Sequence, residues 1–365
     1  MIYEQIREDT LFIILYAGVT FMAMMASCYL LLRRANAIAP DVTPPLRLRW
    51  WTGALFAAIA LSHVWYMPIF FLTSSEDIKL CDLIGGLLDS LTYFPLAIAV
   101  LFAMLQDRRR PLWPIAVMMA PMIAGNAWDL ATRSYALLPM LYGYYLLMCV
   151  GLILYMIRAS RQYGRWLRDN FSDLEHKEVW QSFVVLAAIL QMFAIYALAN
   201  ESRTYVYAML VVCTVLIGYL LWRVETLSDL GSQNEPSTLH QNITSFRPRT
   251  IADNIGPLLK QHCEEPQLYL QYDISLAQLA TQIGVNRSYL SKHFASQGIT
   301  YNAYINGLRI QHFVKLYREA VATHQPVTAQ QLAHQSGFRN YNTFSAAFKR
   351  MMGMNTTEWM LTVKS

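Results

Sequence analysis

Two short segments near the C-terminus carry polar side chains of the kinds that hydrogen-bond to nucleic-acid bases and phosphates. An arginine can donate two hydrogen bonds to guanine, and an asparagine can pair with adenine in the same two-bonded way. Basic side chains also bind phosphates, which positions a protein on a duplex without specifying sequence, and this is the role expected of Arg339 and Arg350. The full candidate set is Arg287, Ser288, Ser291 and Lys292 in the first segment, and Arg339, Asn340, Asn342, Thr343, Lys349 and Arg350 in the second.

The elements that must position these side chains occur twice along the chain. The residues Leu279-Ala280, Gly284, Ser291 and Phe294 return as Leu332-Ala333, Gly337, Ser345 and Phe348, at an offset of 53 residues up to the glycine and 54 after it. Each copy predicts a short helix, a tight turn and a second helix with an apolar inner face. This arrangement is typical of the helix-turn-helix, whose second helix enters the major groove of DNA.

Capping residues and apolar spacing predict the helices around this repeat. Ser275, Asn286 and Thr328 are suited to cap helix N-termini, and Gly284 and Gly337 lie where a helix must reverse quickly. The predicted helices are 252–264, 275–283, 287–296, 302–322, 328–335, 340–352 and 356–361. The apolar sets expected to form two small cores are Leu276, Leu279, Ile283, Val285, Leu290 and Phe294, and Leu332, Phe338, Phe344 and Phe348.

These runs resemble the AraC/XylS family of bacterial transcription regulators. The resemblance rests on LATQIGVNRSYL at 279–290, SGFRNYNTFSAAFK at 336–349 and Leu308-Arg309-Ile310 between them, and it covers about the last 100 residues. It implies two helix-turn-helix units joined by one long helix, with two recognition helices in successive segments of the major groove. The sequence departs from the family pattern at two places. Residues 353–357 lack the proline that the family typically has, and residues 295–297 are Ala-Ser-Gln where the family commonly has basic residues.

The composition of the chain is unlike that of a soluble protein. Apolar residues make up 55% of the 365 residues and charged residues only 15%, whereas soluble domains carry about 25% charge. Stretches of about 20 apolar residues can cross a hydrocarbon core of about 30 Å. We therefore predict seven membrane spans, at 11–32, 50–72, 83–105, 111–129, 137–157, 179–199 and 205–222. The five scattered cysteines form no CxxC pair, so we expect no zinc site, no other metal and no cofactor.

The distribution of basic residues predicts the orientation of these spans. Twelve Lys/Arg lie in the loops after the first, third and fifth spans, whereas the N-terminus and the alternate loops hold four. Cytoplasmic loops are enriched in Lys and Arg, so the N-terminus is predicted outside and the C-terminus in the cytoplasm. The last part of the chain, from Arg247 onward, carries 12 Lys/Arg against 6 Asp/Glu, which suits a polyanionic partner.

The predicted domain organisation is a membrane domain at 1–230, a polar linker at 231–250 and a DNA-binding domain at 251–365. Leu220, Val224, Leu227 and Leu230 keep helical spacing after the last span. They indicate either a short dimerising stalk or a helix end that frays into solvent. Within the spans, His63, Asp89 and Gln191 are the candidates for a signal-binding site, because polar groups at membrane depth usually face a bundle interior.

The fold class expected is all-α: a seven-helix transmembrane bundle followed by a cytoplasmic AraC-type double helix-turn-helix domain. The function expected is a one-component transcription regulator of the bacterial inner membrane, with no enzyme activity. Its expected partners are double-stranded promoter DNA, the lipid bilayer, RNA polymerase, a second copy of the chain and a signal ligand of unknown identity. Two alternatives stay open, namely a transporter or channel with a regulatory DNA-binding tail, and a passive membrane anchor for the regulator.

Overall fold

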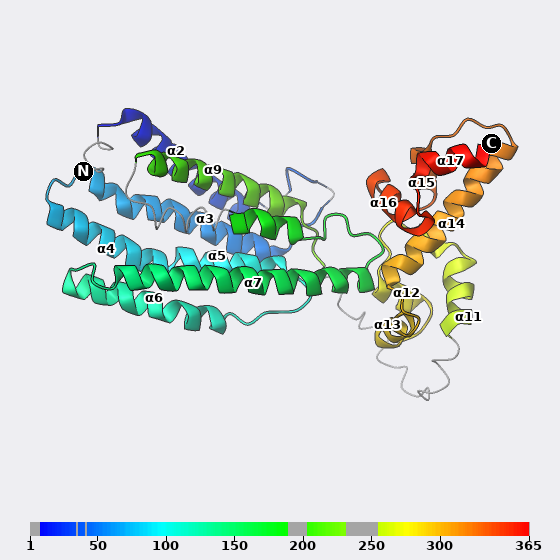
Figure 1. Ribbon diagram of the computed structural model, residues 1–365, viewed down its shortest axis with the longest axis horizontal. Coiled ribbons are helices and arrows are strands. Elements are labelled where there is room, and N and C mark those ends of the chain that lie inside the picture. Colours follow the sequence, from blue (N-terminus) through cyan, green and yellow to red (C-terminus); the bar gives the residue numbers. More distant parts are fainter. Residues whose placement is uncertain (1–7, 34–35, 41, 189–202, 231–254, 365) are drawn as a thin grey trace. The chain divides into compact units, whose positions relative to one another are not determined.

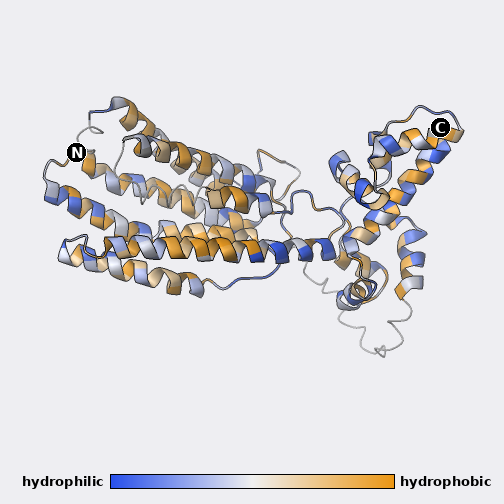
Figure 2. Ribbon diagram, viewed as in Figure 1, coloured by the Kyte–Doolittle hydropathy of each residue, from blue (hydrophilic) through white to orange (hydrophobic). Residues whose placement is uncertain are grey.

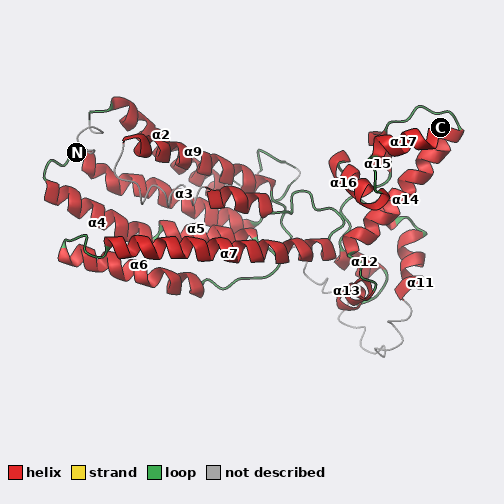
Figure 3. Ribbon diagram, viewed as in Figure 1, coloured by secondary structure: helices red, strands yellow, loops and turns green. Residues whose placement is uncertain are grey.

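The computed structural model describes residues 8–33, 36–40, 42–188, 203–230 and 255–364. Helices and turns account for the regular structure of these residues, and the described ranges hold no β-strand beyond one isolated bridge (Figures 1 and 3). The chain divides into two compact units. The bundle unit comprises Met1–Tyr163 and Val179–Leu230, and the C-terminal unit comprises Gly164–Glu178 and Gly231–Ser365.

The bundle unit is built from long apolar helices (Figure 2). They are α2 (Thr10–Leu32), α3 (Leu46–Tyr66) extended by the 3₁₀ turn η1 (Met67–Phe70), α4 (Ser75–Leu91), α5 (Tyr93–Met104), α6 (Trp113–Thr132), α7 (Leu138–Asn170) and α9 (Arg203–Thr226). Residues 180–188 are also helical. Within the described residues, five stretches are long and apolar enough to cross a membrane: Thr10–Leu32, Leu46–Phe70, Ser75–Met104, Leu138–Asn170 and Val206–Thr226.

These five stretches coincide with the first, second, third, fifth and seventh predicted spans. The third is two helices, because the backbone leaves the helical region at Thr92 and the chain restarts as α5, with Pro95 in its first turn where no N–H is needed. The fourth predicted span forms α6, a helix of 20 residues that contains Asp129 and is not among the five. Most of the sixth predicted span, with Gln191, lies outside the described residues.

Small residues bring α2 and α3 close together in the bundle unit. The hydroxyl of Ser27 donates to the carbonyl of Gly53 at 2.8 Å, and a Cβ added at Gly53 would lie 2.7 Å from the Leu31 side chain. Such close backbone approach is typical of helix pairs in membranes. Meanwhile large apolar side chains face outward, among them Phe21 and Leu147, which are 60% and 71% exposed. An apolar outer surface of this kind is compatible with lipid as solvent.

Hydrogen bonds among helix ends and loops mark the two ends of the bundle unit. At one end, Arg47 donates to the carbonyl of Arg110, and Gln106 donates to the carbonyl of Ser228. At the other end, Tyr207 donates to Asp9 at 2.7 Å, and Tyr135 donates to Asp82 at 3.0 Å. The two cation-rich loops after α2 and α5 therefore meet at the same end, which is the end where α9 finishes.

The segment after α9 forms neither a stalk nor a frayed helix. The helix ends at Thr226, and Val224, Leu227 and Leu230 are completely buried in the bundle unit. The amide of Leu230 donates to the side chain of Gln106 at 2.8 Å, which fixes the end of this segment. The predictions of a dimerising stalk and of a frayed helix end are therefore both wrong. The apolar side chains that suggested them pack inward within their own unit.

The C-terminal unit is an array of short helices around one long helix, α14 (Tyr301–Ala322). Before it lie α11 (Ile255–Leu259), the π-helical turn η3 (Lys260–Glu264), the 3₁₀ turn η4 (Leu268–Leu270), α12 (Leu276–Gln282) and α13 (Arg287–Ser296). After it lie α15 (Ala329–Gln335), α16 (Tyr341–Met352) and α17 (Thr356–Lys364). Each bound from α12 to α16 lies within a residue or two of the predicted one, because local capping and glycine signals mark these ends.

Candidate nucleic-acid interface

The first helix-turn-helix unit consists of α12, a four-residue turn and α13. Ser275 caps α12 through a capping box with Gln278, in which each side chain binds the backbone of the other residue. Gly284 takes a positive φ of 71° in the turn, and Asn286 caps α13 by accepting from the amide of Ser288 at 2.8 Å. The predicted apolar set forms the core of this unit, with Val285 at its edge, and Tyr301 and Ile305 of α14 complete it.

The second unit repeats this construction with α15 and α16. Thr328 and Gln331 form the same capping box, and Asn340 caps α16 by accepting from the amide of Asn342 at 2.7 Å. The predicted set around Phe344 forms the core and is joined by Phe313 of α14 and by α17. Gly337 has a φ of 86°, and a Cβ there would lie 2.8 Å from the backbone of Leu270, so this turn requires glycine sterically as well as conformationally.

The two recognition helices present most of the predicted DNA-binding side chains to solvent. In α13, Ser288 and Lys292 are exposed, and Ser291 is half-buried. In α16 and the turn before it, the exposed members of the predicted set are Arg339, Asn342, Lys349 and Arg350, and Thr343 is half-buried. These positions are open to a ligand, and their donors and acceptors match the edges of bases and the oxygens of phosphates.

Two of the predicted residues already have partners within the C-terminal unit. The guanidinium of Arg287, the first residue of α13, donates to the side-chain oxygen of Asn170 with a 3.1 Å distance from its Nε. The amide nitrogen of Asn340 donates to the Glu175 carboxylate at 3.1 Å, while its oxygen caps α16. Burial lowers the pKa of Arg287, which reflects its partial withdrawal from solvent.

These partners belong to a segment that the sequence did not associate with DNA binding. We call residues 170–178, which begin at the last residue of α7, the docking segment. Phe171 forms an isolated antiparallel bridge with Ser275, and the amide and hydroxyl of Ser172 both donate to the carbonyl of Ile274, the hydroxyl at 2.8 Å. Asn302 at the start of α14 donates to the carbonyl of Ser172 at 2.7 Å. No local sequence signal could have revealed these contacts, because the partners are more than 100 residues apart.

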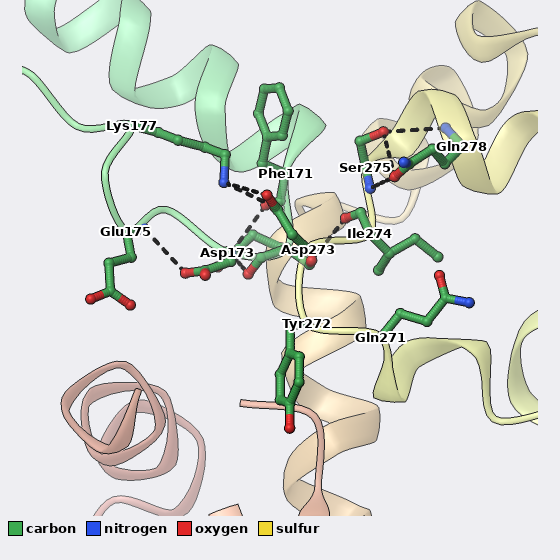
Figure 4. Close-up of polar contacts among 12 residues, drawn as sticks. Phe171, Asp173, Glu175, Lys177, Gln271, Tyr272, Asp273, Ile274, Ser275 and Gln278 are labelled. Carbon is green, nitrogen blue, oxygen red and sulfur yellow. Dashed lines mark hydrogen bonds and ion pairs between the residues drawn. The ribbon is translucent and has the colours of Figure 1, made fainter. Parts of the chain in front are cut away.

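An ion pair attaches the last part of the docking segment to the residues before α12. Lys177 Nζ lies 2.9 Å and 3.1 Å from the two carboxylate oxygens of Asp273, and it also lies over the ring of Phe171 (Figure 4). The Lys177 side chain is only 3% exposed, whereas that of Asp273 is 34% exposed, so solvent screens the pair on the carboxylate side. Nearby, burial raises the pKa of Asp173, although the amide of Glu175 donates to its carboxylate. The docking segment is therefore packed against the C-terminal unit rather than lying in solvent.

Arg309 of α14 links the two helix-turn-helix units. Its buried guanidinium donates to the carbonyls of Tyr269, Gln271 and Tyr272, before the first unit, and lies over the ring of Phe338 in the turn of the second unit. Burial lowers its pKa to about 10, so the group stays charged at neutral pH. The sequence marked Arg309 only as part of a family resemblance, and its structural role depends on long-range contacts.

Of the residues proposed to sense a signal, the described ones lie in a polar cluster of the bundle unit. The ring of His63 on α3 packs against that of Tyr16 on α2, at a centroid distance of 4.7 Å, and its Nδ1 lies 2.8 Å from the carbonyl of Ile59. The Asp89 carboxylate on α4 faces the side chains of Ser62 and Tyr66 on α3. Among the described residues, no group of His, Cys, Asp and Glu could hold a metal ion.

The bundle unit also contains an apolar cavity of about 580 Å³. Its lining comes from α5, α7, α9 and residues 180–187, with Tyr93, Met148 and Phe183 among the apolar groups. Ser160 and Arg161 supply polar atoms from the later part of α7. A cavity of this size falls within the range that takes small molecules, and its lining suits a lipophilic one.

Comparisons with known proteins agree with the geometry of the C-terminal unit. Residues 279–361 match the model of a family described as a helix-turn-helix domain, which is the AraC type. An uncharacterized HTH-type transcriptional regulator of Staphylococcus aureus strain MRSA252 is 30% identical over 132 residues, which are 35% of this chain and 17% of that protein. The chain therefore ends in an AraC-type helix-turn-helix domain, and it is similar to DNA-binding transcription regulators in this part.

Another relative is shorter and comes from a different bacterium. The TCP pilus virulence regulatory protein of Vibrio cholerae serotype O1 is 29% identical over 84 residues, which are 23% of this chain and 29% of that protein. No solved structure gives a significant match. The chain spans less than a fifth of the length of the Staphylococcus aureus relative, so the likeness concerns the helix-turn-helix domain and not the whole protein.

Proposed function

We propose that this protein is a membrane-integral, one-component transcription regulator that binds promoter DNA sequence-specifically, and that its bundle unit senses a signal. The observation that carries the proposal is a single chain in which five of the described stretches are apolar and long enough to cross a membrane, and these precede two capped helices with exposed polar side chains that suit base edges. A helix-turn-helix domain needs access to DNA, which agrees with the cytoplasmic C-terminus predicted from the basic loops.

The length of the linking helix α14 suits two recognition helices on one face of a DNA duplex. The linking helix α14 has 22 residues and so is about 33 Å long at 1.5 Å per residue. Two recognition helices one DNA turn apart, about 34 Å, read successive segments of the major groove. We assign Arg287, Ser288, Ser291, Asn340, Asn342 and Thr343 to base edges, and Lys292, Arg339, Lys349 and Arg350 to phosphates or guanines.

Two features of the bundle unit support a sensing role over a passive anchor. The polar cluster of Tyr16, His63 and Asp89 places costly groups among apolar helices, and such groups are usually retained for a function. The apolar cavity beside α7 offers space for a lipophilic ligand. A ligand can alter DNA binding only if it binds two states of the protein with different affinity.

Substitution of exposed side chains tests the DNA-binding proposal. The full chain is placed in lipid nanodiscs, and a 40-base-pair duplex is selected with it from a random-sequence pool. Asn342→Ala is expected to weaken binding of that duplex by about 1–3 kcal/mol, because a base contact is lost. The salt slope, which is the slope of log K against log salt concentration, is expected to stay constant. Arg350→Ala is expected to weaken selected and unrelated duplexes alike, and to reduce the salt slope by about 1.

The matched control is Gln311→Ala, which removes an exposed polar side chain from α14, outside both recognition helices. Equal losses for all three variants would contradict the assignment of the interface. Recruitment of RNA polymerase and pairing with a second copy are further parts of the proposed function. Solute flux through vesicles containing the full chain would instead support the transporter alternative.

A further inference from the structure

We propose that the docking segment is an autoinhibitory element, which competes with DNA for the N-terminal ends of both recognition helices. The inference rests on the proposed DNA-binding function and names how that site is regulated. Asn170 accepts from Arg287 at the first residue of α13, and Glu175 accepts from Asn340 at the cap of α16. One short segment therefore contacts the same end of both recognition helices.

The contacted ends are those that a duplex needs. In helix-turn-helix complexes, the N-terminal residues of the recognition helix contact base edges in the major groove. Arg287 donates its guanidinium hydrogen bonds to Asn170, so the same donors are not available to guanine in the docked state. Likewise the amide nitrogen of Asn340 is directed to a carboxylate rather than to a base. DNA binding and docking at these two residues are mutually exclusive.

Charge strengthens the competition. The stretch from Asp169 to Glu178 contains Asp169, Asp173, Glu175 and Glu178 against one lysine, whereas the DNA-binding part of the chain has twice as many basic as acidic residues. Negative charge is favourable at a helix N-terminus, and the Glu175 carboxylate lies beside the N-cap of α16. A phosphate brought to the same place by DNA would meet this carboxylate as a like charge.

The anchoring contacts are separate from the blocking contacts. Ser172 binds the carbonyl of Ile274, Asn302 binds the carbonyl of Ser172, and Lys177 pairs with Asp273. Phe171, Ser172 and Lys177 are at most 2% exposed. Because these anchors do not involve the residues assigned to DNA, the blocking pair Asn170 and Glu175 can be altered while the segment keeps its attachment.

The covalent path connects the docking segment to the proposed sensor. α7 is one continuous helix from Leu138 to Asn170, and it is one of the five helices able to cross a membrane. Its last seven residues, 164–170, belong to the C-terminal unit, and the earlier ones line the apolar cavity. A signal that shifts α7 thus displaces Asn170 directly, and the released Arg287 becomes available to DNA.

The test compares DNA affinity of full chains in lipid nanodiscs, with a fluorescent 40-base-pair duplex selected by the wild-type chain. The double variant Asn170→Ala/Glu175→Ala is expected to bind this duplex about tenfold more tightly, because the docked state no longer competes for Arg287 and Asn340. The matched control is Asp169→Asn, which removes one negative charge from the same stretch at an exposed position. It is expected to change the affinity less than twofold.

A second measurement follows docking itself. In the wild-type chain the amide of Ser172 donates to Ile274, so its hydrogen exchange is expected to be slow without DNA and faster at saturating duplex. Unchanged or weaker DNA binding in the double variant, or unchanged exchange at Ser172, would overturn the autoinhibition while DNA binding by the wild type stands. If no chain binds any duplex, the proposed function fails together with this inference.

Discussion

At the scale of single residues, the buried guanidinium of Arg309 connects the two helix-turn-helix units of the C-terminal unit. It satisfies three backbone carbonyls and stacks on Phe338, so it holds the segment before the first helix-turn-helix against the turn of the second. A planar fork with five donors suits this task, and a lysine could not reach the same carbonyls together. A side chain outside the predicted DNA-binding set thus links the two helix-turn-helix units.

Arg309→Lys is therefore expected to reduce the free energy of unfolding of the C-terminal unit by about 2–4 kcal/mol, because buried carbonyls lose their donors. Urea pulse proteolysis of the full chain, detected through a C-terminal tag, measures this change. Arg318→Lys serves as the control, since Arg318 is exposed on the same helix. A loss of equal size in both variants would show that the three carbonyl contacts are not the cause.

A half-buried histidine, His312, gives the C-terminal unit a pH dependence. Burial lowers the pKa of His312 below its ordinary value, with a smaller effect of the same sign from Lys315. As pH falls, the unfolded chain takes up the proton first, so the stability contributed by neutral His312 is complete above about pH 6.5 and is lost below it. The free energy of unfolding is expected to fall between pH 7.5 and 5.5, and His312→Gln is expected to flatten this trend. A variant with the full wild-type pH dependence would rule out His312 as its source.

At the scale of elements, the two helix-turn-helix units are alike in sequence but differ in how their turns are packed. Gly284 and Gly337 both take a positive φ, yet only Gly337 abuts another backbone, that of Leu270. The repeat predicted both glycines for conformational reasons. The steric requirement at Gly337 could not be predicted, because Leu270 belongs to a turn 67 residues earlier.

This difference predicts unequal effects of the same substitution. Gly284→Ala is expected to cost about 1–2 kcal/mol, which is the penalty of a left-handed backbone for alanine in open space. Gly337→Ala is expected to cost about 2 kcal/mol more, because the new Cβ would overlap Leu270. Pulse proteolysis of both full-length variants gives the comparison, and equal losses would mean that the chain around Leu270 yields without cost.

Elements with local signals were predictable, and those that rely on distant partners were not. Ser275, Asn286 and Thr328 marked helix starts correctly, because a cap binds the backbone two or three residues away. In contrast, the polar residues 170–178 read as an ordinary loop between two spans. Leu227 and Leu230 read as one face of a helix, but they are buried after the helix has ended. In each failure, contacts across many residues decided the structure.

At the scale of the whole molecule, the division into units does not follow the order of the chain. Residues 164–178 interrupt the bundle unit in sequence and belong to the C-terminal unit in space. The sensor and the DNA-binding part proposed here therefore share a segment, in addition to the connection through residue 231. A passive anchor would not require a segment from within its own sequence to pack in the C-terminal unit. This division therefore favours the sensing proposal.

Replacement of residues 1–222 by an unrelated membrane anchor separates these roles. The chimaera lacks the docking segment, so it is expected to bind the selected duplex about tenfold more tightly than the wild-type chain, like the Asn170→Ala/Glu175→Ala variant. Anisotropy titrations in matched nanodiscs measure the three affinities. Wild-type affinity in the chimaera would indicate that the bundle unit leaves the DNA-binding domain unaffected.

The bridge between Phe171 and Ser275 joins two parts of one polypeptide, and this fact has a consequence for how the protein would respond to its own abundance. Association within one chain proceeds at an effective concentration set by the chain, whatever the number of copies in the cell. Occupancy of a promoter, in contrast, rises with copy number. Gene dosage would therefore change the number of occupied promoters. The fraction of molecules in the docked, DNA-free state would depend on the contacts of residues 170–178 and not on copy number.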